Sequence, residues 1–144
     1  MKARKILFFV QIFYLWGLLS TASALSYLDV EKMIRAGMSE ELIQAQIEKN
    51  NDYFTYDEII FLKGRKLANN LVEFLLRYHL SFIPDIDVAF LIKMKSVPLS
   101  DEIVQMLVDR FGVTSLPLAP NEIIALKNAK VNNKLIEYLI NSGK

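Results

Sequence analysis

The sequence has no cysteine among its 144 residues. This absence excludes disulfide bonds, thiol nucleophiles, iron–sulfur clusters, thiolate zinc sites and the lipid-modified cysteine of a bacterial lipoprotein. Histidine is nearly absent as well, with one at His79. The folded state must therefore depend on a hydrophobic core, which a domain of about 120 residues is large enough to form.

The chain also lacks an excess of charge, with 17 basic and 16 acidic residues. Three basic residues, Lys2, Arg4 and Lys5, come before the first acidic one, Asp29. Setting these three aside leaves 14 basic against 16 acidic groups, a net charge of −2. This balance gives no support to a nucleic acid partner. Apolar residues make up 53% of the chain, which excludes a disordered protein.

The N-terminus has the pattern of an export signal. Residues 1–5 contain three basic residues, residues 6–19 are apolar apart from Gln11, and Ala22-Ser23-Ala24 has the small-x-small form of a signal peptidase site. The pattern predicts a signal peptide over residues 1–24 and cleavage before Leu25. A retained membrane anchor stays open, although the apolar run is shorter than the roughly 20 residues of a spanning helix. The prediction is therefore an exported protein, periplasmic or extracellular.

The rest of the chain contains a fourfold internal repeat. Each copy predicts a short helix, a tight turn and a second short helix, because apolar residues recur at helical spacing. The copies are Asp29–Ile47, Glu58–Leu76, Phe90–Val108 and Glu122–Ile140. Helices this short are unstable alone, so each hairpin needs its neighbours to cover it. We expect an all-α fold: a signal helix, then one domain (25–144) of four helical hairpins packed as a small solenoid, in two tandem units (25–80 and 81–144).

Helix-start signals recur in each copy. Side chains able to cap a helix N-terminus stand at Ser26, Thr55, Asp87, Ser39, Ser100 and Asn132. Ser26 with Asp29, and Thr55 with Glu58, predict capping boxes. The fourth copy has Ala119 at its first cap, followed by Pro120, which is favoured at the first helical position. Ala68 stands at the second cap of the second copy and predicts the weakest turn there.

The ends of a repeat array should be polar where inner copies are apolar. The first copy has Glu31 where the others have isoleucine, and Gln46 where the others have leucine. We therefore expect Glu31 and Gln46 to face outward. The fourth copy keeps its apolar residues, which predicts that its outer side is covered by the signal helix, another subunit or a partner.

The first half, Leu25–Leu76, carries the stretches DVEKMIRAGMSEELIQAQI and EIIFLK. On these residues it resembles a tandem helical-hairpin module common in exported bacterial proteins. The second half, Ile83–Ile140, looks like a duplication with looser motifs, since Pro98 and Lys130 stand in place of the glycine. The resemblance implies a helical fold and export, and it implies no activity and no site.

No residue set predicts a catalytic, cofactor or metal site. His79 has no neighbouring ligand pattern. Ser39-Glu40 and Ser100-Asp101 could be a nucleophile beside a base, and the pairs Asp57–Glu58 and Asp85–Asp87 could be a metal or glycosidase pair. All of these stand at expected helix starts, where acids and serines are favoured for capping. We therefore expect neither an enzyme nor a bound cofactor.

Two features are candidate partner contacts. Lys63, Lys95 and Lys127 occupy equivalent positions and would form a basic ridge, either complementing helix dipoles or meeting anionic lipid, cell-wall polymer or an acidic partner. Acidic residues at the second-helix starts favour the first interpretation. Phe61 stands where other copies have lysine or alanine. It is either an exposed contact residue or packed under the loop of residues 53–56.

These observations favour a non-catalytic extracytoplasmic helical-repeat protein that mediates protein–protein or cell-envelope interaction. Self-association through the C-terminal hairpin is one form this could take. The alternative is a cell-envelope enzyme or enzyme inhibitor whose site is not visible in the sequence. Contact with a membrane is expected only if the signal segment is retained.

Overall fold

The computed structural model describes residues 24–143, which contain eight α-helices and two very short strands. The protein is mostly helical, as the repeat predicted. The expected signal peptide covers residues 1–24. Apart from its last residue, Ala24, it lies outside the described residues.

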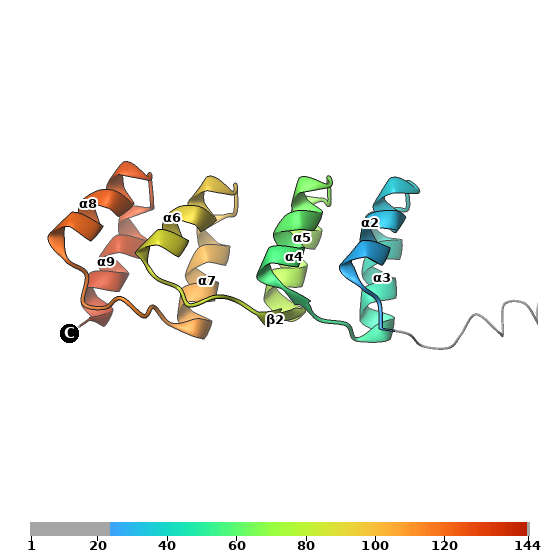
Figure 1. Ribbon diagram of the computed structural model, residues 1–144, viewed down its shortest axis with the longest axis horizontal. Coiled ribbons are helices and arrows are strands. Elements are labelled where there is room, and N and C mark those ends of the chain that lie inside the picture. Colours follow the sequence, from blue (N-terminus) through green and yellow to red (C-terminus); the bar gives the residue numbers. More distant parts are fainter. Residues whose placement is uncertain (1–23, 144) are drawn as a thin grey trace, which may run out of the picture.

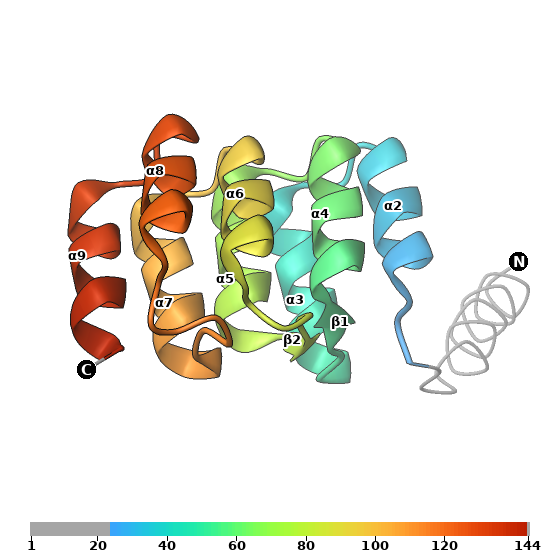
Figure 2. The same cartoon turned by 60° about the vertical axis from the view of Figure 1, so that its left-hand side comes forward.

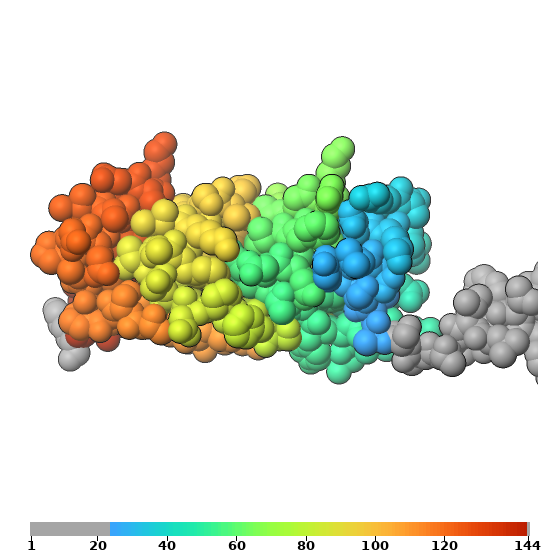
Figure 3. Space-filling view, in the orientation of Figure 1, coloured from blue at the N-terminus to red at the C-terminus, as the bar shows by residue number. Residues whose placement is uncertain are grey.

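The helices form four hairpins. They are α2 (Tyr27–Arg35) with α3 (Glu40–Asn50), α4 (Tyr56–Gly64) with α5 (Asn69–Tyr78), α6 (Val88–Ser96) with α7 (Asp101–Phe111), and α8 (Pro120–Asn128) with α9 (Asn133–Ser142). The hairpins stand side by side in chain order, with the first helices along one side of the row and the second helices along the other (Figures 1 and 2). In the space-filling view the described hairpins follow one another as adjoining bands along the long axis (Figure 3).

The helices begin at the residues that the capping signals predicted. Ser26 and Thr55 each accept a backbone N–H three residues on, and Asp29 and Glu58 return the bond, so both capping boxes are present. Side-chain oxygens also cap α3, α6, α7 and α9. At the start of α8, the Glu122 carboxylate accepts the Ala119 N–H. Helix α5 has Ala68 at its N-cap position and no side-chain cap, because the alanine side chain has no acceptor.

The turn inside the hairpin needs a left-handed backbone in three copies. Gly37, Lys66 and Lys130 have φ of 72°, 73° and 60° and occupy equivalent positions. Glycine adopts this conformation freely, whereas a side chain brings its Cβ too close to the following carbonyl oxygen. The two lysines therefore hold a conformation that costs free energy. In the third copy Pro98 occupies this place.

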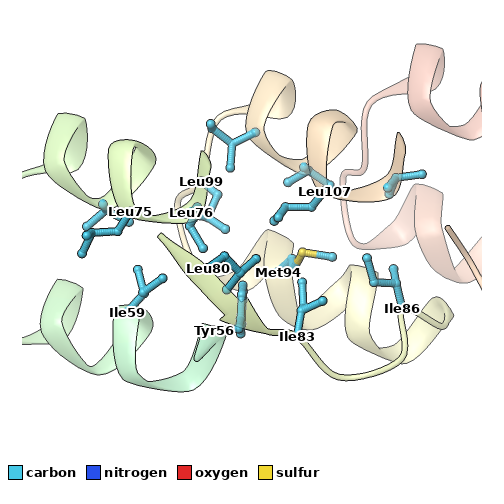
Figure 4. Close-up of a cluster of buried hydrophobic side chains, with 14 of the residues drawn as sticks. Tyr56, Ile59, Leu75, Leu76, Leu80, Ile83, Ile86, Met94, Leu99 and Leu107 are labelled. Carbon is cyan, nitrogen blue, oxygen red and sulfur yellow. The ribbon is translucent and has the colours of Figure 1, made fainter. Parts of the chain in front are cut away.

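The repeated apolar positions form the core. Leu71, Ile103 and Leu135 occupy the same apolar position in the last three copies, and they are only 2%, 0% and 4% exposed. One cluster of buried side chains includes residues from all four hairpins. Its central part contains Leu75 and Leu76, with Met94 nearby (Figure 4).

The connections between hairpins contain a strand pair that the repeat pattern did not predict. β1 (Phe54–Thr55) and β2 (Leu80–Phe82) pair in parallel, with Phe54 beside Leu80. Both of these side chains are buried. Because β1 follows α3 and β2 follows α5, the pairing ties together the C-terminal ends of these two helices.

One expectation about the ends of the row is wrong. Gln46 is exposed as predicted, but Glu31 is buried. Its carboxylate oxygen Oε1 lies 2.7 Å from Arg35 Nη2 in the same helix and 3.3 Å from Arg65 Nε in the second hairpin. The repeat position of Glu31 therefore faces the following hairpin, and an ion pair replaces the apolar contact there.

Candidate interaction surfaces

Exposed aromatic side chains gather where the second helices end. Tyr53, Tyr78, Phe82 and Phe111 are 54%, 61%, 60% and 42% exposed. Tyr78 and Phe111 end α5 and α7, Tyr53 lies between α3 and β1, and Phe82 ends β2. These segments lie along one edge of the row of hairpins (Figure 2). We call the four residues the aromatic edge.

His79 anchors the middle of the aromatic edge. Its ring centroid lies 5.6 Å from that of Tyr53 and 5.0 Å from that of Phe74, and the Phe74 ring lies 5.5 Å from Tyr78. His79 is buried, and its Nδ1 lies 2.6 Å from the backbone carbonyl oxygen of Asp52. A carbonyl oxygen can only accept, so Nδ1 carries the proton and donates. His79 thus joins the end of the first hairpin to the end of the second.

An arginine pair continues this edge toward the third hairpin. The Arg110 guanidinium lies 5.0 Å from the Phe111 ring centroid, and its Nη1 donates to the Arg77 carbonyl oxygen over 3.3 Å. Beside it an open groove of about 1010 Å³ runs between α5, α7 and α9. Its lining mixes acidic and basic side chains, including Asp109, Arg110 and Lys134. The mixture gives the groove no field of one sign.

The charged groups at the start of α7 serve the local structure. Lys95 and Asn132 donate to the Asp101 carboxylate, and the Lys95 hydrogen bond is the main cause that lowers the pKa of Asp101. Ser100 Oγ accepts the Ile103 N–H over 3.3 Å. The serine and the acid that could have been a nucleophile and its base are therefore both engaged in holding helix ends.

Acidic residues of the two other candidate pairs also form local hydrogen bonds or ion pairs. Glu58 completes the cap at Thr55, Asp57 lies 3.5 Å from Lys93, and Asp87 accepts the Phe90 N–H over 2.7 Å. Within residues 24–143, no three His, Asp or Glu side chains are arranged to hold a metal ion. No helix in that same range combines the length and the apolar character needed to cross a lipid bilayer.

The three lysines of the expected basic ridge differ in their contacts. Lys63 Nζ donates to Asn69 Oδ1 over 2.6 Å, and Lys95 pairs with Asp101. Each of these two lysines thus holds the start of the second helix in its own hairpin, while Lys127 is exposed. Pairing with Asp101 removes much of the field that Lys95 would add to a ridge.

Phe61 contacts the first hairpin through Tyr27. The Phe61 ring stands edge-on to the Tyr27 ring, with 5.4 Å between the two centroids. The Arg65 guanidinium lies over the Phe61 ring, 5.0 Å from its centroid. It remains partly accessible, with 36% of its surface exposed. Phe61 is therefore mainly a contact between hairpins.

The sequence interpretation missed the aromatic edge because its residues lie outside the aligned repeat segments. A signal was present, since each of the four follows the last aligned residue of a copy by two to six positions. The same connections also contain buried residues such as Phe54 and Leu80, so position alone does not distinguish an exposed aromatic residue from a buried one.

No family model, no curated protein and no solved structure matches this chain. A function has to be argued from the surface of the protein itself, namely the aromatic edge and the two ends of the row.

Proposed function

We propose that this protein is an exported, non-catalytic helical-repeat protein that binds another protein through the aromatic edge. The observation that carries the proposal is the exposure of Tyr53, Tyr78, Phe82 and Phe111 along one edge. Aromatic side chains are enriched at the energetic centres of protein interfaces, and gathered exposed apolar surface marks such sites. Ring contacts through His79 and Phe74 hold two of the four in place, so little order has to be gained on binding.

The arrangement of the hairpins supports a solenoid, the finer form of the fold. Each hairpin covers an apolar face of the next, and the first helices and the second helices form separate rows (Figure 2). Solenoid proteins use their extended surfaces for binding partners. An edge made by the ends of successive helices is such a surface.

Export is supported by the sequence pattern of residues 1–24 and by the place where the folded hairpins begin. The first helix is capped at Ser26, directly after Leu25. Mass spectrometry of the protein recovered from the cell envelope or the medium should give a chain that starts at Leu25. A full-length species held in the membrane would instead establish the anchor.

Affinity capture from envelope extracts tests the binding proposal. The wild-type chain should recover a defined protein, and the double variant Tyr78→Ala/Phe82→Ala should not recover it. Both side chains are mostly exposed, so their removal leaves the core intact and the loss would report on binding. Phe61→Ala is the matched aromatic control on the first helices and should still recover the partner. Loss with Phe61→Ala and retention with the double variant would move the contact to the first helices and refute the aromatic edge.

The alternative, an envelope enzyme or enzyme inhibitor, has no observation in its favour among the described residues. Ser39, Ser100 and Asp101 are engaged at helix starts. Purified protein that hydrolyses an envelope substrate would nevertheless overturn the non-catalytic proposal.

A further inference from the structure

The C-terminal end of the row leaves an apolar face open. Ile124, Tyr138 and Ile140 are 59%, 41% and 38% exposed. Their equivalents in the third hairpin, Ile92, Met106 and Val108, are buried or partly buried against the core. We call Ile124, Tyr138 and Ile140 the C-terminal face.

The N-terminal end leaves the opposite half of the same junction open. Leu42 is 54% exposed and Gln46 is exposed beside it along α3. The residues equivalent to Leu42 in the later hairpins are Leu71, Ile103 and Leu135, and all three are buried. We call Leu42 and Gln46 the N-terminal face.

We infer that the C-terminal face of one copy binds the N-terminal face of a second copy, so that the second copy's first hairpin stacks as a fifth repeat. Inside the chain, the equivalent residues of the inner hairpins are buried or partly buried in the core shared by neighbouring hairpins. Helix α5 packs on α7, and α6 packs on α8, in this way. The occupant of the open face is therefore specified by the chain's own packing. The inference rests on the solenoid arrangement and on the removal of residues 1–24 in the proposed function, and it is independent of the aromatic edge.

Charge favours this pairing over a symmetric one. Residues 25–53 contain six acidic and three basic groups, a net charge of −3, whereas residues 119–143 contain two acidic and three basic groups, a net charge of +1. Opposite net charges attract, while two N-terminal ends would repel. A head-to-tail contact joins unlike ends, and a symmetric one joins like ends.

Polar contacts at the inner junctions also have counterparts at the ends. Asn70 donates to Glu40 of the preceding hairpin over 2.8 Å. By repeat position, Asn133 takes the place of Glu40 in the fourth hairpin, and Glu41 takes the place of Asn70 in the first. The amide and the carboxylate change sides, and the pair stays complementary. Lys63 Nζ also lies 3.5 Å from the Pro98 carbonyl oxygen of the following hairpin, and Lys127, its exposed equivalent, is placed to reach the same turn in a second copy.

Sedimentation equilibrium with two blocked variants tests the inference. The protein is the chain from Leu25 onward, which contains all the described helices and their core. Leu42→Asp blocks the N-terminal face and Ile124→Asp blocks the C-terminal face, and both sites are exposed, so unchanged melting should show that the fold is intact. Wild-type protein should associate as its concentration rises. Each variant alone should stay monomeric, and an equal mixture should form a dimer through the two faces that remain.

Three outcomes would overturn the inference: wild-type protein that stays monomeric at every concentration, a Leu42→Asp variant that still dimerises, or a mixture that does not associate. Tyr78→Ser serves as the control on the aromatic edge and should associate as the wild type does. If the wild-type protein captures its partner but does not self-associate, the head-to-tail contact is refuted and the proposed function is not. If it self-associates but captures no partner, the proposed function is refuted and the head-to-tail contact is not.

A separate observation concerns the buried carboxylate of Asp52. Its side chain is only 8% exposed, and Oδ2 accepts the backbone N–H of Leu25 over 2.8 Å. Leu25 is the residue that follows the predicted cleavage site. A buried carboxylate is costly unless a positive charge or several hydrogen bonds compensate for it.

We infer that Asp52 binds the α-ammonium group that cleavage after Ala24 creates at Leu25. Hydrolysis of the Ala24–Leu25 peptide bond leaves a carboxylate on Ala24 and an amine on Leu25, which takes up a proton at neutral pH. The nitrogen that already donates to Asp52 then carries a full positive charge. This step rests on the export part of the proposed function, and processing would strengthen the contact that ties the chain start to the end of α3.

Two chains that differ at one nitrogen test this second inference without relying on export. One begins with a free amine at Leu25, and the other carries an acetyl group on that amine. The free-amine chain should melt at the higher temperature, and Asp52→Asn should abolish the difference between the two. Equal melting of both chains with Asp52 present, or a difference that persists in Asp52→Asn, would overturn the inference. Neither outcome bears on whether cells cleave the chain.

Discussion

The first and second hairpins each consist of two short helices joined by a tight turn, but they differ in what packs against them. Leu42 and Leu71 are equivalent leucines, yet Leu42 is 54% exposed and Leu71 is 2% exposed. Helix α3 buries two residues, whereas α5 buries four. Among the described residues the first hairpin has a neighbour on one side and the second has neighbours on both. Burial of a repeat position is therefore decided by the adjacent hairpin, and not by the local sequence.

The largest expected difference between the two hairpins is at this leucine. Leu71→Ala should lower the free energy of unfolding by about 2–5 kcal/mol, because it opens a cavity between two hairpins. Leu42→Ala should cost less than about 0.5 kcal/mol, since the side chain is largely in water already. Chemical denaturation of both variants measures the difference. Similar losses would show that α3 is covered in solution, as head-to-tail association at the working concentration would do.

The turn between the helices gives the next largest difference. Gly37 and Lys66 share a left-handed backbone, and an added Cβ at Gly37 would meet no atom within 4 Å. Gly37→Ala should therefore cost about 1–2 kcal/mol from backbone conformation alone. Lys66→Gly should gain about 0.5–1 kcal/mol, because glycine removes the strain but gives the unfolded chain more freedom. Thermal melts decide it, and a loss of stability in Lys66→Gly would mean that its side chain makes contacts that outweigh the strain.

The start of the second helix is the third difference. Ser39 Oγ caps α3, whereas Ala68 leaves α5 without a side-chain cap. Ser39→Ala should cost about 1 kcal/mol, and Ala68→Ser should gain about as much. Equilibrium unfolding of the two variants and of the combined variant provides the measurement. A neutral Ala68→Ser would show that water already satisfies the exposed N–H groups there.

Local chemistry made much of the fold predictable. The caps at Ser26, Thr55 and Ser100 follow from residue type and spacing within one turn, and the burial of Leu71 and Ile103 follows from helical periodicity. Such features need no knowledge of which hairpin stands beside which. The left-handed backbone at Lys66 could also be predicted from the sequence, because Lys66 aligns with Gly37.

Features that depend on packing between hairpins were not predictable. Glu31 was expected to face outward because the sequence does not say on which side the next hairpin lies, and its partner Arg65 is 34 positions away. The pairing of β1 with β2 was missed because strands of two and three residues are too short to show alternation. The aromatic edge combines residues at three different connections between hairpins, and each residue looks ordinary by itself.

The smallest expected difference is at a single hydroxyl group. Tyr27 and Tyr56 are equivalent, but Tyr27 is partly exposed while Tyr56 is buried with its ring 5.1 Å from Phe90. The Tyr56 hydroxyl has no hydrogen-bond partner among the described residues, and burial raises its pKa from the ordinary value of 10.0. Tyr56→Phe should therefore gain up to about 1 kcal/mol, because the hydroxyl loses its bonds to water on folding. Tyr27→Phe is the control and should change stability by less than about 0.5 kcal/mol.

The pH dependence of the same pair separates desolvation from a simple packing effect. In the unfolded chain Tyr56 begins to lose its proton near pH 10, while in the folded protein its raised pKa keeps it neutral. The unfolded state thus gains from ionisation first, and the wild type should lose extra stability as the pH rises above about 10. Denaturation curves at pH 7 and pH 10.5 should show the advantage of Tyr56→Phe growing with pH and that of Tyr27→Phe staying near zero. An advantage that is the same at both pH values would mean that Tyr56 ionises as readily in the fold as outside it.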